Sequence, residues 1–153
     1  MAKAKRSSKK GSFKLTINWK KFIISSIAVF IGLFVTDFVI HGQLLSGLYA
    51  QNAKLFRSMT EMNSLMNYMI AGQILISLTF VFLYTQGYSG GKTSIGEGLR
   101  YGFYVSLLTC VAHSVAMYAW ALYPMDLIQA WAATGVVQVT ILGGIAGLTY
   151  SHK

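Results

Sequence analysis

Charged residues are scarce in this sequence of 153 residues. They make up 11% of the chain, against about 25% in a soluble globular domain. Hydrophobic residues make up 54%, and the mean hydropathy is +0.52. Such a chain has too few polar groups to cover a surface that faces water. The composition therefore excludes a soluble domain and predicts a membrane protein with room for one domain.

Cysteine and proline each occur once. Cys110 has no second cysteine to pair with, which excludes an intrachain disulfide and a metal site built from several cysteines. We expect Cys110 to pack in a membrane helix without reacting. The single proline, Pro124, leaves the long apolar runs uninterrupted. We therefore expect an all-α protein.

Acidic residues number 4, against 13 lysines and arginines, and the net charge is +9. Most of the positive charge lies in a basic tail over residues 1–21. A lysine near an anionic membrane surface contributes about 1 kcal/mol, so we expect this tail to contact anionic headgroups or an acidic partner. It lacks the interleaved aromatic residues of a nucleic-acid site, so no nucleic-acid partner is expected. The expected contact residues are Lys9, Lys10, Lys14, Lys20 and Lys21.

Four long apolar stretches follow the tail, over about 22–45, 65–86, 99–122 and 127–150. About 20 residues at 1.5 Å per residue cross the hydrocarbon core of a bilayer. Only a helix satisfies its own backbone groups in lipid, segment by segment. The sequence therefore predicts a bundle of four transmembrane helices over residues 22–153.

The basic residues near the helix ends predict the orientation, because cytoplasmic loops are enriched in lysine and arginine. The tail, the 87–98 loop with Arg100, and Lys153 fall on one side, whereas only Lys54 and Arg57 fall on the other. Both termini are therefore expected in the cytoplasm. A cleaved signal peptide is the alternative for the first stretch, but its apolar run is longer than a signal sequence requires. Aromatic residues are expected near both interfaces: Trp19, Tyr84, Tyr88, Tyr101 and Tyr150 inside, and Tyr49, Tyr68, Trp120, Tyr123 and Trp131 outside.

The connection over 46–64 is too long for a tight turn. Its leucines and methionines recur at helical spacing, which predicts an amphipathic helix on the outer surface, continuing into the second stretch. Thioethers also bind Cu(I), but no histidine or cysteine lies nearby, and methionine suits an interfacial face. The stripe consists of Leu48, Leu55, Met59, Met62, Met66 and Met69. After the third stretch, Asp126 is expected to cap the fourth helix.

Two ionisable residues, Asp37 and His41, interrupt the first apolar stretch. They are four residues apart and so lie on one face of a helix. Counting along the helices places Asp37 and His113 of the third stretch at similar depth. If the first and third helices are neighbours, Asp37 accepts a hydrogen bond from His113. Gln73, Gln129 and Gln138 are polar residues that the other helices could add.

This intramembrane polar cluster of Asp37, His41, His113 and Gln73 has two interpretations. Ionisable residues in a membrane are costly, and they often mark proton or substrate pathways. Polar residues also join helices by satisfying one another. A zinc site and a two-histidine haem site are further alternatives, but the spacing across two helices is weak evidence for either, so we predict no metal and no cofactor. No catalytic arrangement is present, and we predict that the protein is not an enzyme.

The segment GYSGGKTS, residues 87–94, is similar to a phosphate-binding loop. It has three residues between Gly87 and Gly91, whereas the loop requires four, and no strand is expected before it. We therefore expect a flexible connection.

Small residues recur every four positions in the last two stretches, a pattern that lets membrane helices approach closely. The third stretch has Gly102, Ser106, Cys110 and Ser114, and the fourth has Gly143 and Gly147. The pattern predicts a compact bundle or an oligomer, and it does not distinguish contacts within one chain from contacts between chains.

Two segments, DFVIHGQLLSGLYA and IGEGLRYGFYVSLL, on four predicted helices resemble small bacterial membrane proteins of the domain-of-unknown-function type. The resemblance covers about residues 25–150. It implies a bacterial inner-membrane protein and no particular activity or functional residue.

These observations favour a non-enzymatic accessory or assembly subunit of a membrane complex. The alternative is a small oligomeric transporter or proton-linked channel that uses Asp37, His41 and His113.

Overall fold

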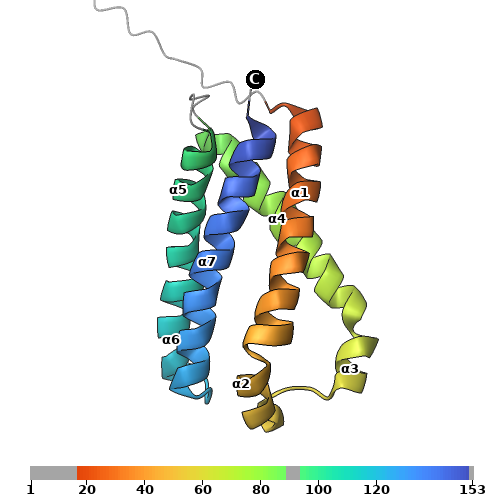
Figure 1. The fold of residues 1–153 in the computed structure, drawn as a ribbon, viewed down its shortest axis with the longest axis vertical. Coiled ribbons are helices and arrows are strands. Elements are labelled where there is room, and N and C mark those ends of the chain that lie inside the picture. The colour runs from red at the N-terminus through yellow and green to blue at the C-terminus, as the bar shows by residue number, and fades with distance from the viewer. Residues whose placement is uncertain (1–16, 89–93, 152–153) are drawn as a thin grey trace, which may run out of the picture.

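The structure is a computed structural model that describes residues 17–88 and 94–151. Within these ranges, all regular structure is helical (Figure 1). Four helical segments are long and apolar enough to cross a membrane: Trp19–Leu44, Met66–Gly87, Ser94–Trp120 and Met125–Tyr150. The predicted class, an all-α membrane protein with four spans, is confirmed.

Two of the spans contain a π-helical turn. The first span consists of α1 (Trp19–Val39) and the π-helix η1 (Ile40–Leu44). The third span consists of α5 (Ser94–Ser106), the π-helix η3 (Leu107–Ala112) and α6 (His113–Trp120). π-Turns within α-helices are frequent at functional sites. The turn in the first span contains His41 and directly follows the helix that carries Asp37.

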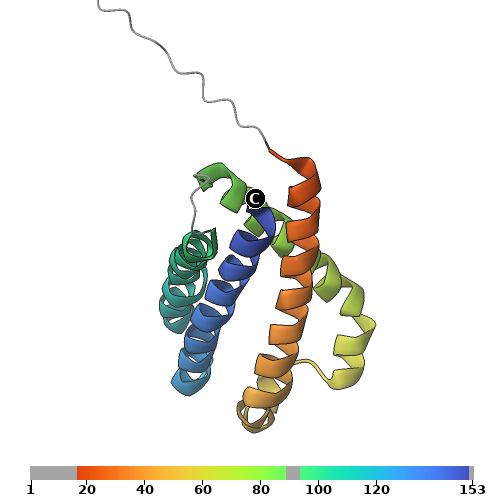
Figure 2. The same cartoon turned by 45° about the horizontal axis from the view of Figure 1, so that its top comes forward.

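Helix α7 (Met125–Tyr150) lies between the first and third spans (Figures 1 and 2). Helix α5 packs along one side of α7, and α1 packs along another. Helix α4 (Met66–Gly87) crosses behind them at an angle and packs mainly against α1. The first and fourth spans are therefore neighbours, and the first and third are separated by α7.

Helices α5 and α7 are in backbone contact. A Cβ atom built on Gly143 would lie 2.2 Å from the carbonyl oxygen of Gly98 and 2.7 Å from Cα of Gly102. A Cβ atom on Gly147 would lie 2.2 Å from the carbonyl oxygen of Ser94. The glycines of the two small-residue stripes thus meet within one chain. Ser106 and Ser114 are buried, and Cys110 lies against Gly135 of α7.

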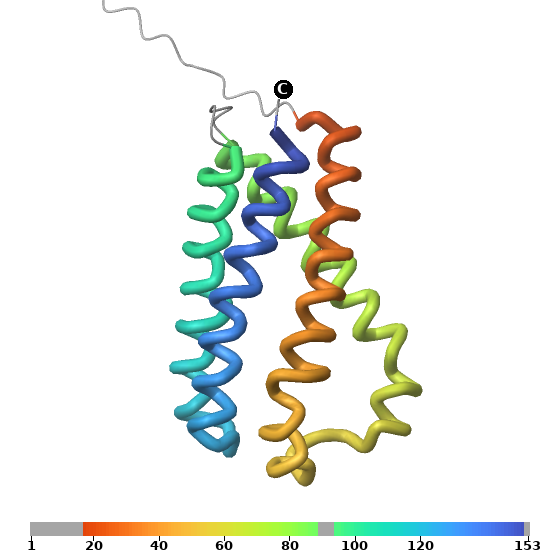
Figure 3. The backbone as a smooth tube through the Cα atoms, viewed as in Figure 1, coloured from red at the N-terminus to blue at the C-terminus, as the bar shows by residue number. Residues whose placement is uncertain are grey.

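Both described ends of the chain lie at the same end of the bundle (Figure 3). The backbone N–H of Asn18 donates to the hydroxyl of Tyr150 over 3.2 Å, and the ammonium group of Lys21 donates to the carbonyl oxygen of Ser151. The main hydrophobic core lies in this half and includes Val29, Leu33, Phe80, Val81, Tyr84, Leu142, Ala146 and Tyr150.

The connection over 46–64 is not one continuous amphipathic helix. It contains α2 (Ser46–Gln51), a 3-10 turn η2 (Ala53–Leu55) and α3 (Met59–Ser64). Phe56 is extended and packs edge-on against Tyr49, with ring centroids 5.1 Å apart. The helical backbone is therefore interrupted at Phe56. A capping box between Ser58 and Glu61 then starts α3.

The start of the fourth span also differs from the prediction. Helix α7 begins at Met125, with Pro124 in the N-cap position, so Asp126 is not the cap. Asp126 lies in the first turn instead, where its Oδ1 accepts from the backbone N–H of Leu127 over 2.9 Å. A carboxylate in this position also suits the positive end of the helix dipole.

Candidate functional site

Asp37 is the centre of a polar cluster that joins three spans. Gln73 of α4 donates from Nε2 to Oδ2 of Asp37 over 2.6 Å. Gln138 of α7 donates from Nε2 to Oδ1 over 2.6 Å. Counted from Trp19, Asp37 lies about 27 Å along the helix, in the half of the span away from the termini. We refer to Asp37, Gln73 and Gln138 as the carboxylate centre.

Gln138 is held in place by a second contact. Its Nε2 also donates to Oγ1 of Thr36 over 2.9 Å, and the hydroxyl of Thr36 donates to the carbonyl oxygen of Gly32 over 2.8 Å. The Gln138 side chain is buried. The donor facing Oδ1 of Asp37 is therefore pre-oriented by neighbours on the same helix as Asp37.

His41 extends the carboxylate centre toward the end of the bundle away from the termini. Its Nε2 lies 3.9 Å from Oδ1 of Asp37, and its Nδ1 lies 2.5 Å from the hydroxyl of Tyr49. The indole N–H of Trp131 donates to the same hydroxyl over 2.8 Å. Because the Tyr49 oxygen accepts from Trp131, its own hydrogen is free to donate to Nδ1. A neutral His41 then carries its proton on Nε2, facing Asp37.

Gln73 has an unused acceptor at the carboxylate centre. Its Oε1 is buried and has no hydrogen-bond partner in the described structure. Buried polar atoms without a partner are uncommon in folded proteins. Rotation of the amide by 180° exchanges Oε1 and Nε2. Gln73 can therefore donate to an ionised Asp37 or accept from a protonated one.

A cavity of about 520 Å³ opens beside the carboxylate centre, between α4 and the third and fourth spans. Asp37, Gln73 and Gln138 line it, together with Thr79 and Thr109. The rest of the lining is apolar and consists of Leu33, Leu75, Ile76, Phe80, Leu83, Val105, Val139 and Leu142. The volume falls within the usual range of small-molecule sites.

His113 does not reach this centre. It begins α6, where it is exposed, and α6 packs on α7, which separates it from α1. The expected contact between Asp37 and His113 is therefore replaced by contacts from Gln73 and Gln138. The prediction assumed that the first and third spans were neighbours, but the close glycine packing brings α5 against α7 instead. Gln129 is exposed and also lies away from the centre.

The zinc and haem alternatives both required His113 as a ligand. In residues 17–88 and 94–151, no group of three or more histidine, cysteine, aspartate or glutamate side chains is arranged to hold a metal ion. The carboxylate centre and the adjoining His41 offer one carboxylate and one imidazole.

Three participants were not predicted as members of the site. Thr36 is adjacent to Asp37 in the sequence, which was a usable signal. Tyr49 and Trp131 were expected only as interfacial residues. Tyr49 contacts His41 and Trp131 contacts Tyr49, and this arrangement depends on the π-turn η1 and on the packing of α2 against it. That geometry has no signature in the sequence.

The expected headgroup-contact residues fall partly outside the description. Lys9, Lys10 and Lys14 lie outside the described residues, as do positions 89–93 of the glycine-rich segment. Lys20 is exposed at the start of α1, beside exposed Trp19.

Searches of protein-family models, of curated proteins and of solved structures each found no match to this chain.

Proposed function

We propose that this chain is a small proton-linked carrier or channel whose transport site is the carboxylate centre. The observation that carries the proposal is that Asp37, held by amides from two other spans, faces a cavity within the membrane-spanning part of the protein. If Asp37 served only to join helices, we would expect its partners to bury its side chain completely. The side chain of Asp37 remains 29% exposed.

The partners of Asp37 suit a group that gains and loses a proton. No lysine or arginine among the described residues lies within ion-pair distance of its carboxylate, so no fixed cation locks the charge. Gln73 can donate from Nε2 or accept at Oε1. The hydrogen bond between these side chains therefore survives in both protonation states.

His41 provides a route between Asp37 and the end of the bundle away from the termini. Its side chain is 44% exposed, and its Nε2 faces Asp37 while Tyr49 holds Nδ1. An imidazole exchanges protons readily because both ring nitrogens take part. The proton on Nε2 of His41 would pass to Asp37 once the 3.9 Å gap closes, and Nδ1 would take up a replacement proton from the exposed side.

The proposal is tested with Asp37→Asn in proteoliposomes, using a trapped pH indicator and a potassium diffusion potential to drive protons. The carboxamide introduced at position 37 can still accept from Gln138 and can donate to Oε1 of Gln73, so the fold should be retained. We expect proton flux to fall by about tenfold or more, because the titratable group is lost.

The matched control is His113→Asn, which removes an exposed titratable group that does not line the cavity and should leave the flux unchanged. Equal flux through wild-type protein and Asp37→Asn would overturn the proposal.

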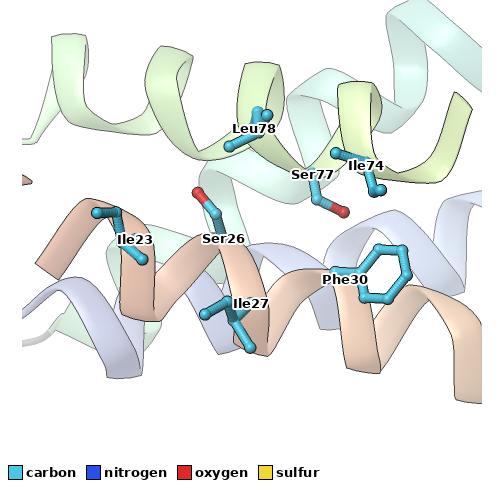
Figure 4. A pocket seen from close by; sticks show the side chains of 7 residues that line it. All are labelled: Ile23, Ser26, Ile27, Phe30, Ile74, Ser77 and Leu78. Atoms are coloured by element: carbon cyan, nitrogen blue, oxygen red, sulfur yellow. The ribbon is translucent and has the colours of Figure 1, made fainter. Parts of the chain in front are cut away.

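An accessory or assembly subunit is the second candidate function. A lateral groove of about 300 Å³ lies where α1 and α4 cross (Figure 4). Ser26 and Ser77 are the small residues in this groove, which is otherwise lined by Ile23, Ile27, Phe30, Ile74 and Leu78. A recess of this kind between membrane helices can receive a bulky side chain from the helix of a partner subunit.

The subunit candidate is tested with Ile27→Trp, which obstructs the groove from an exposed position. Val35→Trp is the control, since both side chains are 55% exposed on α1 and only Ile27 lines the groove. Native mass spectrometry of protein extracted from its own membranes should show a second protein species. Ile27→Trp should remove it and Val35→Trp should retain it. A bare homo-oligomer in the wild type would contradict this candidate.

We also propose that the end of the bundle with both termini faces the cytoplasm of a bacterial inner membrane. The exposed Lys20 at that end supports this orientation under the positive-inside rule. Labelling of a cysteine at position 20 by an impermeant reagent in inverted vesicles, but not in intact cells, would support it. The reverse result would exclude it.

A further inference from the structure

The cavity beside the carboxylate centre has one charged end and an otherwise apolar lining. Asp37, Gln73 and Gln138 form that end, and leucine, isoleucine, phenylalanine and valine side chains line most of the remainder. The two threonines add little polarity. The hydroxyl of Thr109, for example, is already used in donating to the carbonyl oxygen of Val105 over 2.9 Å. A ligand that fits must therefore combine an apolar body with one polar end.

The polar end offers hydrogen-bond acceptors to a ligand. The hydrogens on Nε2 of Gln138 are used by Asp37 and Thr36. Gln73 donates to Asp37, while its Oε1 is buried without a partner. An ionised carboxylate accepts hydrogen bonds and donates none. The group that completes this end is therefore a donor.

The donor should also be cationic. Among the described residues, the only potential cation within ion-pair distance of Asp37 is His41, and its Nε2 is 3.9 Å away, too far for a hydrogen bond. A carboxylate within a membrane is stabilised by an opposite charge. An ammonium group can donate to Asp37, whose side chain lines the cavity and remains 29% exposed. A carboxylate or sulfate would be repelled.

We propose that this cavity binds amphipathic ammonium compounds, with the ammonium group on Asp37 and the apolar chain between α4 and the third and fourth spans. The proposal names a substrate class for the carrier and rests on the proposed function for its role in transport. The proton and the ammonium group compete for Asp37, because a proton on Asp37 would remove the charge that holds the ammonium group. The opening of the cavity beside exposed Leu75 and Leu83 suits entry from the lipid phase.

The test uses dodecylamine as the probe, with dodecanol and dodecyl sulfate as chain-matched controls. The full chain is placed in lipid nanodiscs, and native mass spectrometry follows adducts across a titration. We expect one dodecylamine per chain and no saturable binding of the two controls. Asp37→Asn should weaken the binding of dodecylamine by about tenfold or more, because a charge-assisted hydrogen bond is lost.

Two further variants separate the charged end from the apolar cavity. Thr109→Leu fills the lining from an exposed position without altering the carboxylate, and it should also weaken binding of dodecylamine. His113→Asn should leave it unchanged. Equal binding by the wild type and Asp37→Asn, or equal binding of dodecylamine and dodecanol, would overturn the proposal. Full binding of dodecylamine by Thr109→Leu would place its alkyl chain outside the cavity, and this result would also overturn the proposal.

The binding and flux measurements can fail independently. If dodecylamine binds through Asp37 but proton flux is absent, the ligand assignment stands and the transport function falls. If proton flux depends on Asp37 but dodecylamine does not bind, the ligand class is wrong and the proton-linked function stands.

Discussion

At the scale of single residues, the side-chain amides of two glutamines stabilise the charge of Asp37 within the membrane-spanning part. Asp37 lies in an apolar helix, and glutamines from α4 and α7 donate to both of its oxygens. Neutral donors stabilise the ionised carboxylate without cancelling its charge, whereas a lysine or arginine would form a closed ion pair. Asp37 is therefore both satisfied in the fold and available to a mobile cation.

Tyr49 links His41 to Trp131, and its removal should cost stability. Tyr49→Phe keeps the aromatic packing but leaves the indole N–H of Trp131 without an acceptor. We expect a loss of about 1–2 kcal/mol in the free energy of unfolding, measured by denaturant titration of the detergent-solubilised protein. Tyr68→Phe is the matched control, because that ring is exposed. Equal stability of both variants would contradict the role assigned to the Tyr49 hydroxyl.

The protonation of Tyr49 defines the pH range of this link. Burial raises the pKa of Tyr49 above its ordinary value of 10.0, the hydrogen bond from Trp131 opposes this, and the nearby charge of Asp37 raises it further. A raised pKa means that the folded state holds the proton more tightly than the unfolded state. The stability from this group is therefore fully present below pH 10.0 and is lost as the pH rises through the folded-state pKa. The difference in the free energy of unfolding between wild type and Tyr49→Phe should therefore become smaller only above pH 10.0.

At the scale of helices, the contact between α5 and α7 depends on the absence of side chains. Gly98 and Gly102 of α5 face Gly143 and Gly147 of α7, with backbone atoms where Cβ atoms would otherwise lie. Lipid tails are as apolar as leucine, so close van der Waals packing replaces the hydrophobic effect as the force between these helices. This contact makes α7 the neighbour of the third span.

Gly143→Ala should separate these helices. The new methyl group would lie 2.2 Å from a backbone oxygen, which cannot move as a flexible side chain can. We expect a loss of about 1–3 kcal/mol in the free energy of unfolding, measured by denaturant titration in detergent. Gly72→Ala is the control: beyond its own helix backbone, no atom of the described residues lies within 4 Å of its Cβ position, and alanine favours a helix. A neutral Gly143→Ala would contradict the close backbone contact.

At the scale of the whole molecule, the arrangement is asymmetric. Helix α7 lies between α1 and α5, and α4 crosses them at an angle. Helix α4 comes close to the third span at Tyr84 and Tyr101, whose ring centroids are 5.3 Å apart. Farther from the termini, the space between α4 and the third span becomes the cavity that reaches Asp37. The cavity is thus a consequence of the crossing of α4. Two groups of aromatic residues pack at opposite ends of the bundle.

The predicted spans agree with the structure to within a few residues, except at the start of the third. That span was predicted from residue 99 and begins at Ser94. The apolar pattern starts late because Gly96, Glu97 and Gly98 lower the local hydropathy. The helix continues through them because Gly98 packs on α7, and this stabilisation depends on a segment far away in the sequence.

The site was predicted in part for a similar reason. Asp37, His41 and Gln73 could be named because polar residues in apolar stretches are costly and must find partners. Helical spacing also placed Asp37 and His41 on one face. The partner of Asp37 in the other helices was misjudged, since similar depth in the membrane does not determine which helices are neighbours.

The sequence by itself determined the class of protein, the four spans and the same-side termini, because these depend on hydrophobicity and length along a continuous chain. Only the tertiary structure decided that Gln138, not His113, faces Asp37, and that a cavity opens beside them. Those features depend on the rotation and crossing of helices. Both are set by contacts between distant residues, above all the glycine contacts that place α7 between the first and third spans.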